Sequence, residues 1–404
     1  MSVRRIPGNV FPLARIVVVS FLAGRCVLAA DPSCFNCHKE QQKLHATSAH
    51  AQAGLTCVDC HGGDPKAADI AAHDTLNFHK PEGKKEIAEF CASCHSDVRK
   101  MNPYGLPTDQ LARYKTSKHG EQLFGKGDTN VATCVDCHGV HDIMKSSSSQ
   151  SRTYAANIPN TCSRCHSNEK LMSQYKLRSD VVAQYKTSYH AHLVLDKGDL
   201  SAPTCITCHG NHGATPPGTV EVGQVCGKCH VRQRELFAKS PHAEAAKGGA
   251  FSECVSCHSN HAIQKASVDL YSKACIQCHE GDKKQMGVCD SLDRLIRNAK
   301  ASYESADKLV HGATVRGLAT DDEQLLLQEV KTQVTQMEAQ QHTLSVTELQ
   351  PVATRADELV NTIRTNVAHL EKVEQWKRHA LVPLWGFLAV MATLFWLKHK
   401  QVKR

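Results

Sequence analysis

Cysteine and histidine recur together along the chain in one fixed pattern. Eighteen of the 20 cysteines belong to C-x-x-C-H motifs, of which there are nine. C-x-x-C-H is the signature of covalent haem attachment, in which two thiols form thioethers to the porphyrin and the adjacent histidine gives one axial bond to the iron. The sequence therefore predicts nine covalently bound haem c groups.

The motifs define most of the predicted site. The predicted thioether ligands are Cys34, Cys37, Cys57, Cys60, Cys91, Cys94, Cys134, Cys137, Cys162, Cys165, Cys205, Cys208, Cys226, Cys229, Cys254, Cys257, Cys275 and Cys278. The predicted proximal iron ligands are His38, His61, His95, His138, His166, His209, His230, His258 and His279. Neither a zinc site nor a disulfide framework requires a histidine after every cysteine pair. Nine histidines in nine such positions therefore favour haem.

The motifs are arranged as a two-haem repeat. A unit reads C-x-x-C-H, a helical spacer, an S-x-H element, a loop and a second C-x-x-C-H. Four units cover residues 34–79, 91–141, 162–212 and 226–261, and a ninth motif stands alone. In three units the second motif continues to another histidine three residues on. The additional histidines are the predicted distal ligands: His50, His119, His190 and His242 in S-x-H elements, and His141, His212 and His261 in extended motifs.

The first unit departs from this pattern, because Asp64 occupies the place of the additional histidine. His73 is the preferred substitute and His79 the alternative, while His45 and His192 are weaker alternatives elsewhere. A histidine three residues after a proximal histidine cannot easily reach the opposite face of the same haem. Each such histidine is therefore expected to ligate a neighbouring haem.

The expected fold over residues 31–290 is a mainly α and irregular multihaem cytochrome c fold with little β structure. Only 5% of the residues are aromatic, and nine apolar macrocycles would replace the missing core side chains. Without haem, this part is not expected to fold.

The composition changes after residue 290. Apolar residues at helical spacing predict three helices, about 291–315, 321–344 and 348–378, which form a helical hairpin or stalk. These apolar stripes are most simply packing faces. His342, near the end of the second helix, is the predicted distal ligand of the ninth haem, and His311 is the runner-up. The hairpin would then both ligate that haem and space the haem array from the bilayer.

Two apolar segments predict the topology. Residues 1–30 are expected to be a signal peptide, with a basic start, a short apolar stretch and a small-residue cleavage site. Residues 380–397 are uncharged and long enough to span a bilayer, with Trp385 and Trp396 assigned to its two interfaces. Residues 398–404 form a basic cytoplasmic tail. The haem-bearing part is therefore expected on the periplasmic side of a bacterial cytoplasmic membrane, held by a single C-terminal anchor.

Over residues 34–290 the sequence resembles periplasmic multihaem c-type cytochromes of the cytochrome c3 and doubled-CxxCH kind. The resemblance rests on the nine C-x-x-C-H motifs, the S-x-H elements and the extended motifs, and the stretch from Cys57 to Pro65 is similar to the opening of such proteins. It implies bis-histidine haems that relay electrons, often beside a membrane quinol-oxidising subunit. The anchored arrangement is also similar to that of quinol dehydrogenase cytochromes, whose anchor is usually N-terminal.

Two functions of different classes follow from these observations. The first is electron relay in anaerobic respiration, between a cytochrome b-type or other quinol-oxidising membrane subunit and periplasmic or extracellular acceptors, with no catalytic residue and no small-molecule substrate required. The alternative is a multihaem oxidoreductase that acts on a small nitrogen or sulfur compound at one haem with an open iron position. No basic run with interleaved aromatic residues indicates a nucleic-acid partner.

Overall fold

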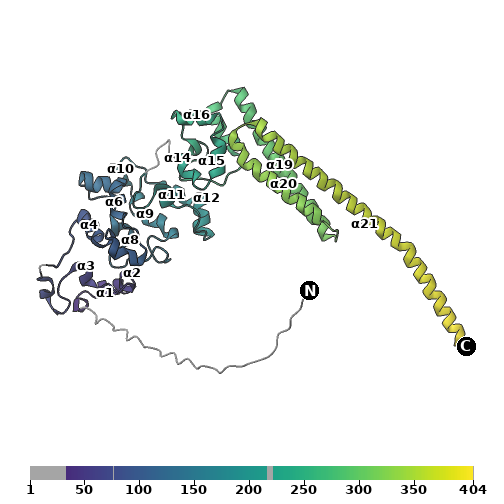
Figure 1. Cartoon of the computed structure of the whole chain (residues 1–404). Helices are drawn as coiled ribbons and strands as arrows, with labels where there is room; N and C mark the ends of the chain where they lie inside the picture. The colour runs from purple at the N-terminus through teal and green to yellow at the C-terminus, as the bar shows by residue number, and fades with distance from the viewer. Residues whose placement is uncertain (1–32, 76, 216–221, 404) are drawn as a thin grey trace, which may run out of the picture. The chain divides into compact units, whose positions relative to one another are not determined.

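The computed structural model describes residues 33–75, 77–215 and 222–403. The predicted signal peptide and Cys26 lie outside these residues. The described part of the chain is mainly helical and contains no strand, as the expected fold class requires. It divides into two units, residues 1–80 and 81–404, and Figure 1 shows the helices of each.

The first unit contains the first two motifs. Its elements are η1 (Ser33–Asn36), α1 (Lys39–Ala46), α2 (Ala49–Gln52), α3 (Cys57–His61) and η2 (Ile70–His73). The Ser48 side chain accepts a hydrogen bond from the backbone N–H of Ala51 and so starts α2, which places His50 in its first turn. The serine of the S-x-H element is therefore a helix cap for the histidine that follows.

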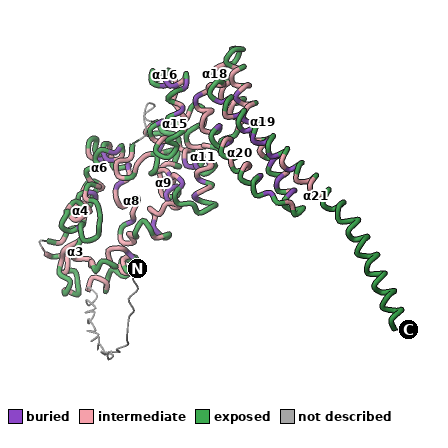
Figure 2. The backbone as a smooth tube through the Cα atoms, turned by 45° about the vertical axis from the view of Figure 1, so that its right-hand side comes forward, coloured by how far each residue is buried: buried purple, intermediate pink, exposed green. Residues whose placement is uncertain are grey.

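The haem-motif part of the second unit consists of short helices joined by loops. Its elements are α4 (Lys84–His95), α5 (Val98–Met101), η3 (Asn102–Tyr104), α6 (Gln110–Thr116), α7 (Lys118–Gly120), η4 (Glu121–Gly125), α8 (Cys134–His138), η5 (Ala155–Asn157), α9 (Ile158–His166), α10 (Glu169–Gln174), α11 (Val181–Lys186), α12 (Tyr189–Ala191), η6 (His192–Asp196), α13 (Cys205–His209), α14 (Val222–Gly227), α15 (Val231–Phe237), α16 (His242–Lys247), α17 (Glu253–His258), η7 (Tyr271–Cys275) and α18 (Ile276–His279). Few of these residues are fully buried (Figure 2).

The first and second motifs of a repeat lie differently in their helices. In the second and third repeats, the first motif is at the end of a longer helix, α4 or α9. The second motif forms a five-residue helix of its own, which a threonine begins. In α8 the backbone N–H of Thr133 donates to the Asp136 carboxylate at 2.7 Å, which is one half of a capping box. The residue between the two cysteines therefore has a structural role in addition to spacing them.

A residue with positive φ follows the second motif of every repeat. Gly62, Gly139 and Gly210 have φ of 64°, 90° and 84°, and Ser259 adopts φ of 60° at the same place in the fourth repeat. A side chain in this region of backbone space is strained by about 1–3 kcal/mol. The turn ends each of these short helices directly after its motif histidine.

A three-helix bundle follows the ninth motif. It consists of α19 (Lys283–Val315), α20 (Asp321–Gln340), the short η8 (Gln341–Thr343) and the first half of α21 (Val346–Val402). Its helices share the largest apolar core of the described residues, which includes Leu292, Ile296, Val330, Met337 and Ile363. The predicted packing stripes are thus the bundle interior.

Two boundaries of the bundle differ from the prediction. The first helix begins at Lys283 rather than at residue 291, because the Asp282 side chain caps the backbone N–H groups of Lys284 and Gln285. The second helix ends at Gln340 rather than at residue 344, because the chain turns at Leu344, which is left-handed with φ of 53°. Both boundaries depend on local capping and turn residues, which cannot be inferred from the spacing of apolar residues.

The third predicted helix and the predicted anchor form one uninterrupted helix, α21. Its last part is exposed from residue 375 onward, and its C-terminal segment is long and apolar enough to cross a membrane (Figure 1). Trp385 and Trp396 are 11 residues apart, which is only about 16 Å along a helix. Trp376 lies 20 residues, or about 30 Å, before Trp396, but Lys377 and Arg378 follow it directly, so the uncharged stretch begins after these two residues.

Candidate haem-binding sites

Seven predicted proximal histidines lie beside a second histidine at nearly constant spacing. The ring centroids are between 5.9 and 6.4 Å apart in all seven pairs. The pairs are His38–His73, His166–His119, His138–His212, His230–His190, His209–His261, His279–His242 and His258–His342. In each pair, one member is the histidine of a C-x-x-C-H motif and the other is a predicted distal ligand.

This spacing is the one that an iron atom between two imidazoles requires. A metal–imidazole bond is about 2 Å long, so two such bonds on opposite sides of one metal, with half of each ring added, separate the ring centroids by about 6 Å. Aromatic side chains that simply pack together have centroid distances anywhere from about 4.5 to 7 Å. The narrow range shared by seven pairs is therefore better explained by a common ligand than by packing.

The histidine pairs in the second structural unit, residues 81–404, follow two rules. A histidine of an S-x-H element lies beside the first motif of the next repeat, as in His119–His166 and His190–His230. The second histidine of an extended motif lies beside the second motif of the preceding repeat, as His212 does beside His138. His212 and His261 thus lie beside the histidine of another motif, while the prediction that they ligate a neighbouring haem stays a prediction.

The structure places His342 beside a different motif from the predicted one. His342 lies beside His258 of the eighth motif, with ring centroids 6.2 Å apart, and His279 of the ninth motif lies beside His242. The pairing rules explain this difference. The ninth motif takes the S-x-H histidine of the fourth repeat, as the first motif of a fifth repeat would. The eighth motif has no further extended motif to supply its partner, and η8 supplies His342 instead.

The alternative distal ligands lie in different surroundings. The ring centroids of His73 and His38 are 6.0 Å apart. The backbone carbonyl of His79 accepts a hydrogen bond from Nδ1 of His61 at 2.9 Å, a contact that does not involve the His79 imidazole. His192 bonds through Nδ1 to the Asp196 carboxylate at 2.7 Å. His311, the runner-up to His342, is exposed on α19. His45 lies near the Phe35 ring.

The other predicted ligands occupy equivalent local positions. His50 follows the Ser48 cap in α2, and His61 is the last residue of α3. His95 is the last residue of α4, as His166 is of α9. His141 follows the left-handed turn at Gly139.

Backbone carbonyls orient several of these rings. Nδ1 of His342 donates to the carbonyl of Ala339 at 3.0 Å, and Nδ1 of His209 donates to that of Thr215 at 3.4 Å. His61 makes the equivalent bond to His79. A hydrogen bond at Nδ1 fixes the tautomer and leaves Nε2 as the nitrogen that can bind a metal.

Burial favours the neutral form of ten of the predicted iron ligands. Removal from water disfavours the charged form of histidine and so lowers its pKa. This effect is the largest cause of the lowered pKa of His95, His119, His138, His166, His190, His212, His242, His258, His261 and His342. A neutral ring offers a nitrogen lone pair at neutral pH, which metal binding requires.

The motif thiols meet in sequence order within the second unit. Inside a repeat, the first cysteines of both motifs are hydrogen-bonded, and the bond from Cys91 lowers the pKa of Cys134 to about 7. Between repeats, burial and then the nearby Cys162 thiol raise the pKa of Cys137 to about 11. Hydrogen bonds within repeats and electrostatic influence between repeats connect the third to the ninth motif through Cys91–Cys134, Cys137–Cys162, Cys162–Cys205, Cys208–Cys226, Cys226–Cys254 and Cys257–Cys278. In the first unit, Cys34 and Cys57 are hydrogen-bonded in the same way.

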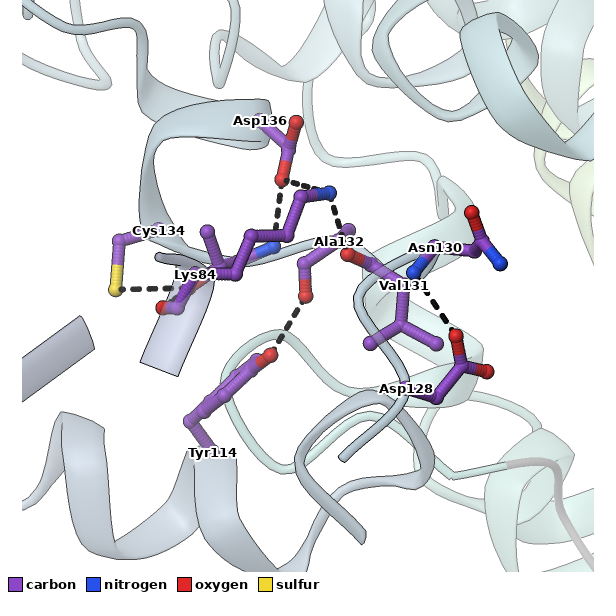
Figure 3. A network of polar contacts seen from close by, with 9 residues as sticks. Lys84, Tyr114, Asp128, Asn130, Val131, Ala132, Cys134 and Asp136 are labelled. Carbon is purple, nitrogen blue, oxygen red and sulfur yellow. Dashed lines mark hydrogen bonds and ion pairs between the residues drawn. The ribbon is translucent and has the colours of Figure 1, made fainter. Parts of the chain in front are cut away.

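Two tyrosines outside the C-x-x-C-H motifs hold the second motifs of two repeats in place. The Tyr114 hydroxyl donates to the carbonyl of Ala132 at 2.6 Å, and the Tyr185 hydroxyl donates to that of Pro203 at 2.9 Å. Each carbonyl belongs to the residue two before the first cysteine of a motif. In Figure 3, Tyr114 reaches Ala132 while Lys84 contacts Asp136 and the carbonyl of Val131. The repeated Y-K-T-S sequence carries this signal, because its tyrosine recurs with its serine.

Loss of the Tyr185 hydroxyl is expected to weaken the fold without changing the haem sites. The Tyr185→Phe variant should lose about 1 kcal/mol of unfolding free energy, because it leaves a part-buried carbonyl without its donor. Denaturant unfolding of the purified holoprotein measures this loss. Tyr104→Phe is the matched control, since Tyr104 is 55% exposed and should show no change. Equal unfolding free energies of the two variants would show that Tyr185 stabilises the fold through packing of its ring and not through its hydroxyl.

The residues present fit haem c. None of the described cysteines is in a disulfide, so all eighteen motif thiols are available for thioethers. Two buried hydroxyls, Oγ of Ser240 and Oγ1 of Thr75, have no hydrogen-bond partner, and each lies two residues from a distal histidine. Haem propionates accept such donors, and an unpaired buried hydroxyl otherwise costs about 1–3 kcal/mol. In the described segments, no three His, Cys, Asp or Glu side chains come together as a metal-binding group, whereas a haem iron needs only two protein ligands.

Comparisons with protein-family models, with curated proteins and with solved structures find no match to this chain.

Proposed function

We propose that this chain is a membrane-anchored electron-transfer protein that carries nine covalent haems, each held by two histidines. The observation that carries the proposal is the constant 6 Å spacing of the histidine pairs, each built on a C-x-x-C-H motif. When bound, each haem iron takes up and releases one electron. The protein contributes the thiols, the two imidazoles and the carbonyls that orient them.

Paired imidazoles favour relay over catalysis. An iron that binds two histidines has no open position for a substrate, and an enzyme of this class needs one. The eighth and ninth motifs follow the same pattern, because His342 and His242 face their proximal histidines. No pair described here favours the alternative function, reduction or oxidation of a small nitrogen or sulfur compound.

The thiol contacts support conduction along the array. Thioether cysteines attach at the edge of the porphyrin, so neighbouring thiols bring neighbouring haem edges together. The contacts link the third to the ninth motif in sequence order. We infer an unbranched path for electrons over these sites. The proposed location is the periplasmic side of a bacterial membrane, and the proposed partners are redox proteins.

Purified protein is expected to contain nine covalent haems, all low-spin when ferric. Two imidazole ligands produce a low-spin ferric iron, whereas a missing ligand leaves a high-spin one. Mass spectrometry of the mature chain counts the haems, and electron paramagnetic resonance of the oxidised protein reports their spin state. Seven or fewer haems would contradict the reading of the motifs. Nine haems with one high-spin signal would instead favour the oxidoreductase.

A further inference from the structure

The three-helix bundle has a defined direction relative to the haem sites. Its upper end carries η8 and His342, and the Tyr271 hydroxyl next to the ninth motif bonds to Oε1 of Gln341 at 2.8 Å. At its lower end, the turn between α19 and α20 lies level with Glu371 of α21, which forms an ion pair with Arg316. The eighth and ninth sites are therefore at the end of the bundle opposite to this turn.

Ion pairs between helices hold the bundle in one register. Lys300 of α19 bonds to Glu338 of α20 at 2.7 Å, and Glu329 of α20 bonds to Arg355 of α21 at 2.9 Å. Together with the Arg316–Glu371 pair, these contacts tie each helix to both others. Because these charged side chains are substantially exposed, the bundle surface is suited to water and not to lipid.

The length of α21 measures the distance from the sites to the apolar segment. Val346 begins the helix beside His342, and the apolar segment begins at Ala380, 34 residues later. At 1.5 Å per residue, this separation is about 51 Å. The helix is continuous over this range, but Pro383 lies just inside the apolar segment and removes one backbone hydrogen bond there, which favours a bend at the junction. The separation along the helix is therefore the greatest height that the sites can have above the segment. A tilt of about 20°, which is usual for membrane-spanning helices, would shorten the height only slightly.

We infer that the bundle is a rigid spacer, and that the eighth and ninth haems exchange electrons with a redox protein, not with a quinol dissolved in the bilayer. The inference rests on the proposed function and on the proposed membrane anchor. Electron tunnelling falls exponentially with distance, so a gap of about 50 Å from the hydrocarbon excludes direct transfer. The partner must carry its own cofactor at that height, either on a membrane subunit that projects as far or on a soluble carrier.

The height of the haems above the bilayer and the kind of molecule that reduces them can be measured on the same sample. The full-length holoprotein is reconstituted into vesicles whose lipid headgroups carry a fluorescent donor that the haems quench. Wild type is expected to quench it weakly. Deletion of residues 372–378, two helical turns below the Arg316–Glu371 pair, should lower the haems by about 10 Å and increase quenching. The control replaces the same seven residues with a helical Glu-Ala-Lys sequence of equal length and should match wild type.

The same vesicles, loaded with a lipid-soluble naphthoquinol, test the donor. No haem reduction is expected from the quinol alone, while a soluble viologen radical should reduce all the haems. Strong quenching by wild type, or its reduction by the quinol without a partner, would overturn the inference. These outcomes differ from failure of the proposed function, which would be seen beforehand as a wrong haem count or a high-spin signal in the same preparation.

Discussion

Replacing His342 with alanine is expected to convert one haem of nine from low-spin to high-spin, and that haem is the one attached at Cys254 and Cys257. The reason is that His342 faces His258 at 6.2 Å and occupies the distal position of that pair. About one ninth of the ferric iron should change its spin state, and the midpoint potential of one haem should shift in a redox titration. His311→Ala is the matched control, because His311 is exposed on the same bundle.

The haem affected by His342→Ala can be identified by removing one haem at a time. In a C254S/C257S background, which cannot attach the eighth haem, His342→Ala should add no high-spin signal. In a C275S/C278S background, which cannot attach the ninth, it should still add one. A high-spin signal in the C254S/C257S background and none in the C275S/C278S background would instead pair His342 with the ninth motif, as the sequence alone suggested. An entirely low-spin single variant would place the ligand on another residue.

Haem-free chain is expected to lose the structure of its motif-bearing part while retaining the bundle. The bundle has an apolar core of its own, with Leu349 and Ile363 fully buried. The motif-bearing part is much longer, yet its buried apolar residues are mostly scattered, and its one buried cluster is the small group of Tyr114, Leu123 and Val131 among the described residues. A region with so little apolar burial cannot offset the conformational entropy of folding without its cofactors.

Protein produced in cells that lack the haem-attachment machinery provides this haem-free chain. Limited proteolysis in detergent should rapidly digest the region before residue 283 and leave a resistant fragment that contains α19, α20 and most of α21. The holoprotein, digested in parallel, is the control and should resist in both parts. Equal resistance in both parts of the haem-free chain would show that the polypeptide, and not haem, forms the core of the motif-bearing region.

Local sequence patterns predicted the helical elements of this protein and proposed its chemistry. Covalent attachment of haem through a C-x-x-C-H motif needs three residues close in sequence, so each motif suggests the same chemistry by itself. The S-x-H element is equally local, because Ser117 and Ser188 cap the short helices that carry His119 and His190. The bundle was predictable for a similar reason, since apolar residues at helical spacing must face a common core.

The pairing of histidines was decided by tertiary structure. A proximal histidine is chemically the same in every motif, and a distal histidine carries no local mark of the iron that it faces. Counting the additional histidines assigns His342 to His279 of the ninth motif, but such a count does not show which motif η8 approaches. The choice depends on where the bundle meets the eighth motif, which is a contact between residues 84 positions apart in the chain. Local sequence determines which side chains could bind haem, and only the path of the folded chain brings two distant histidines side by side.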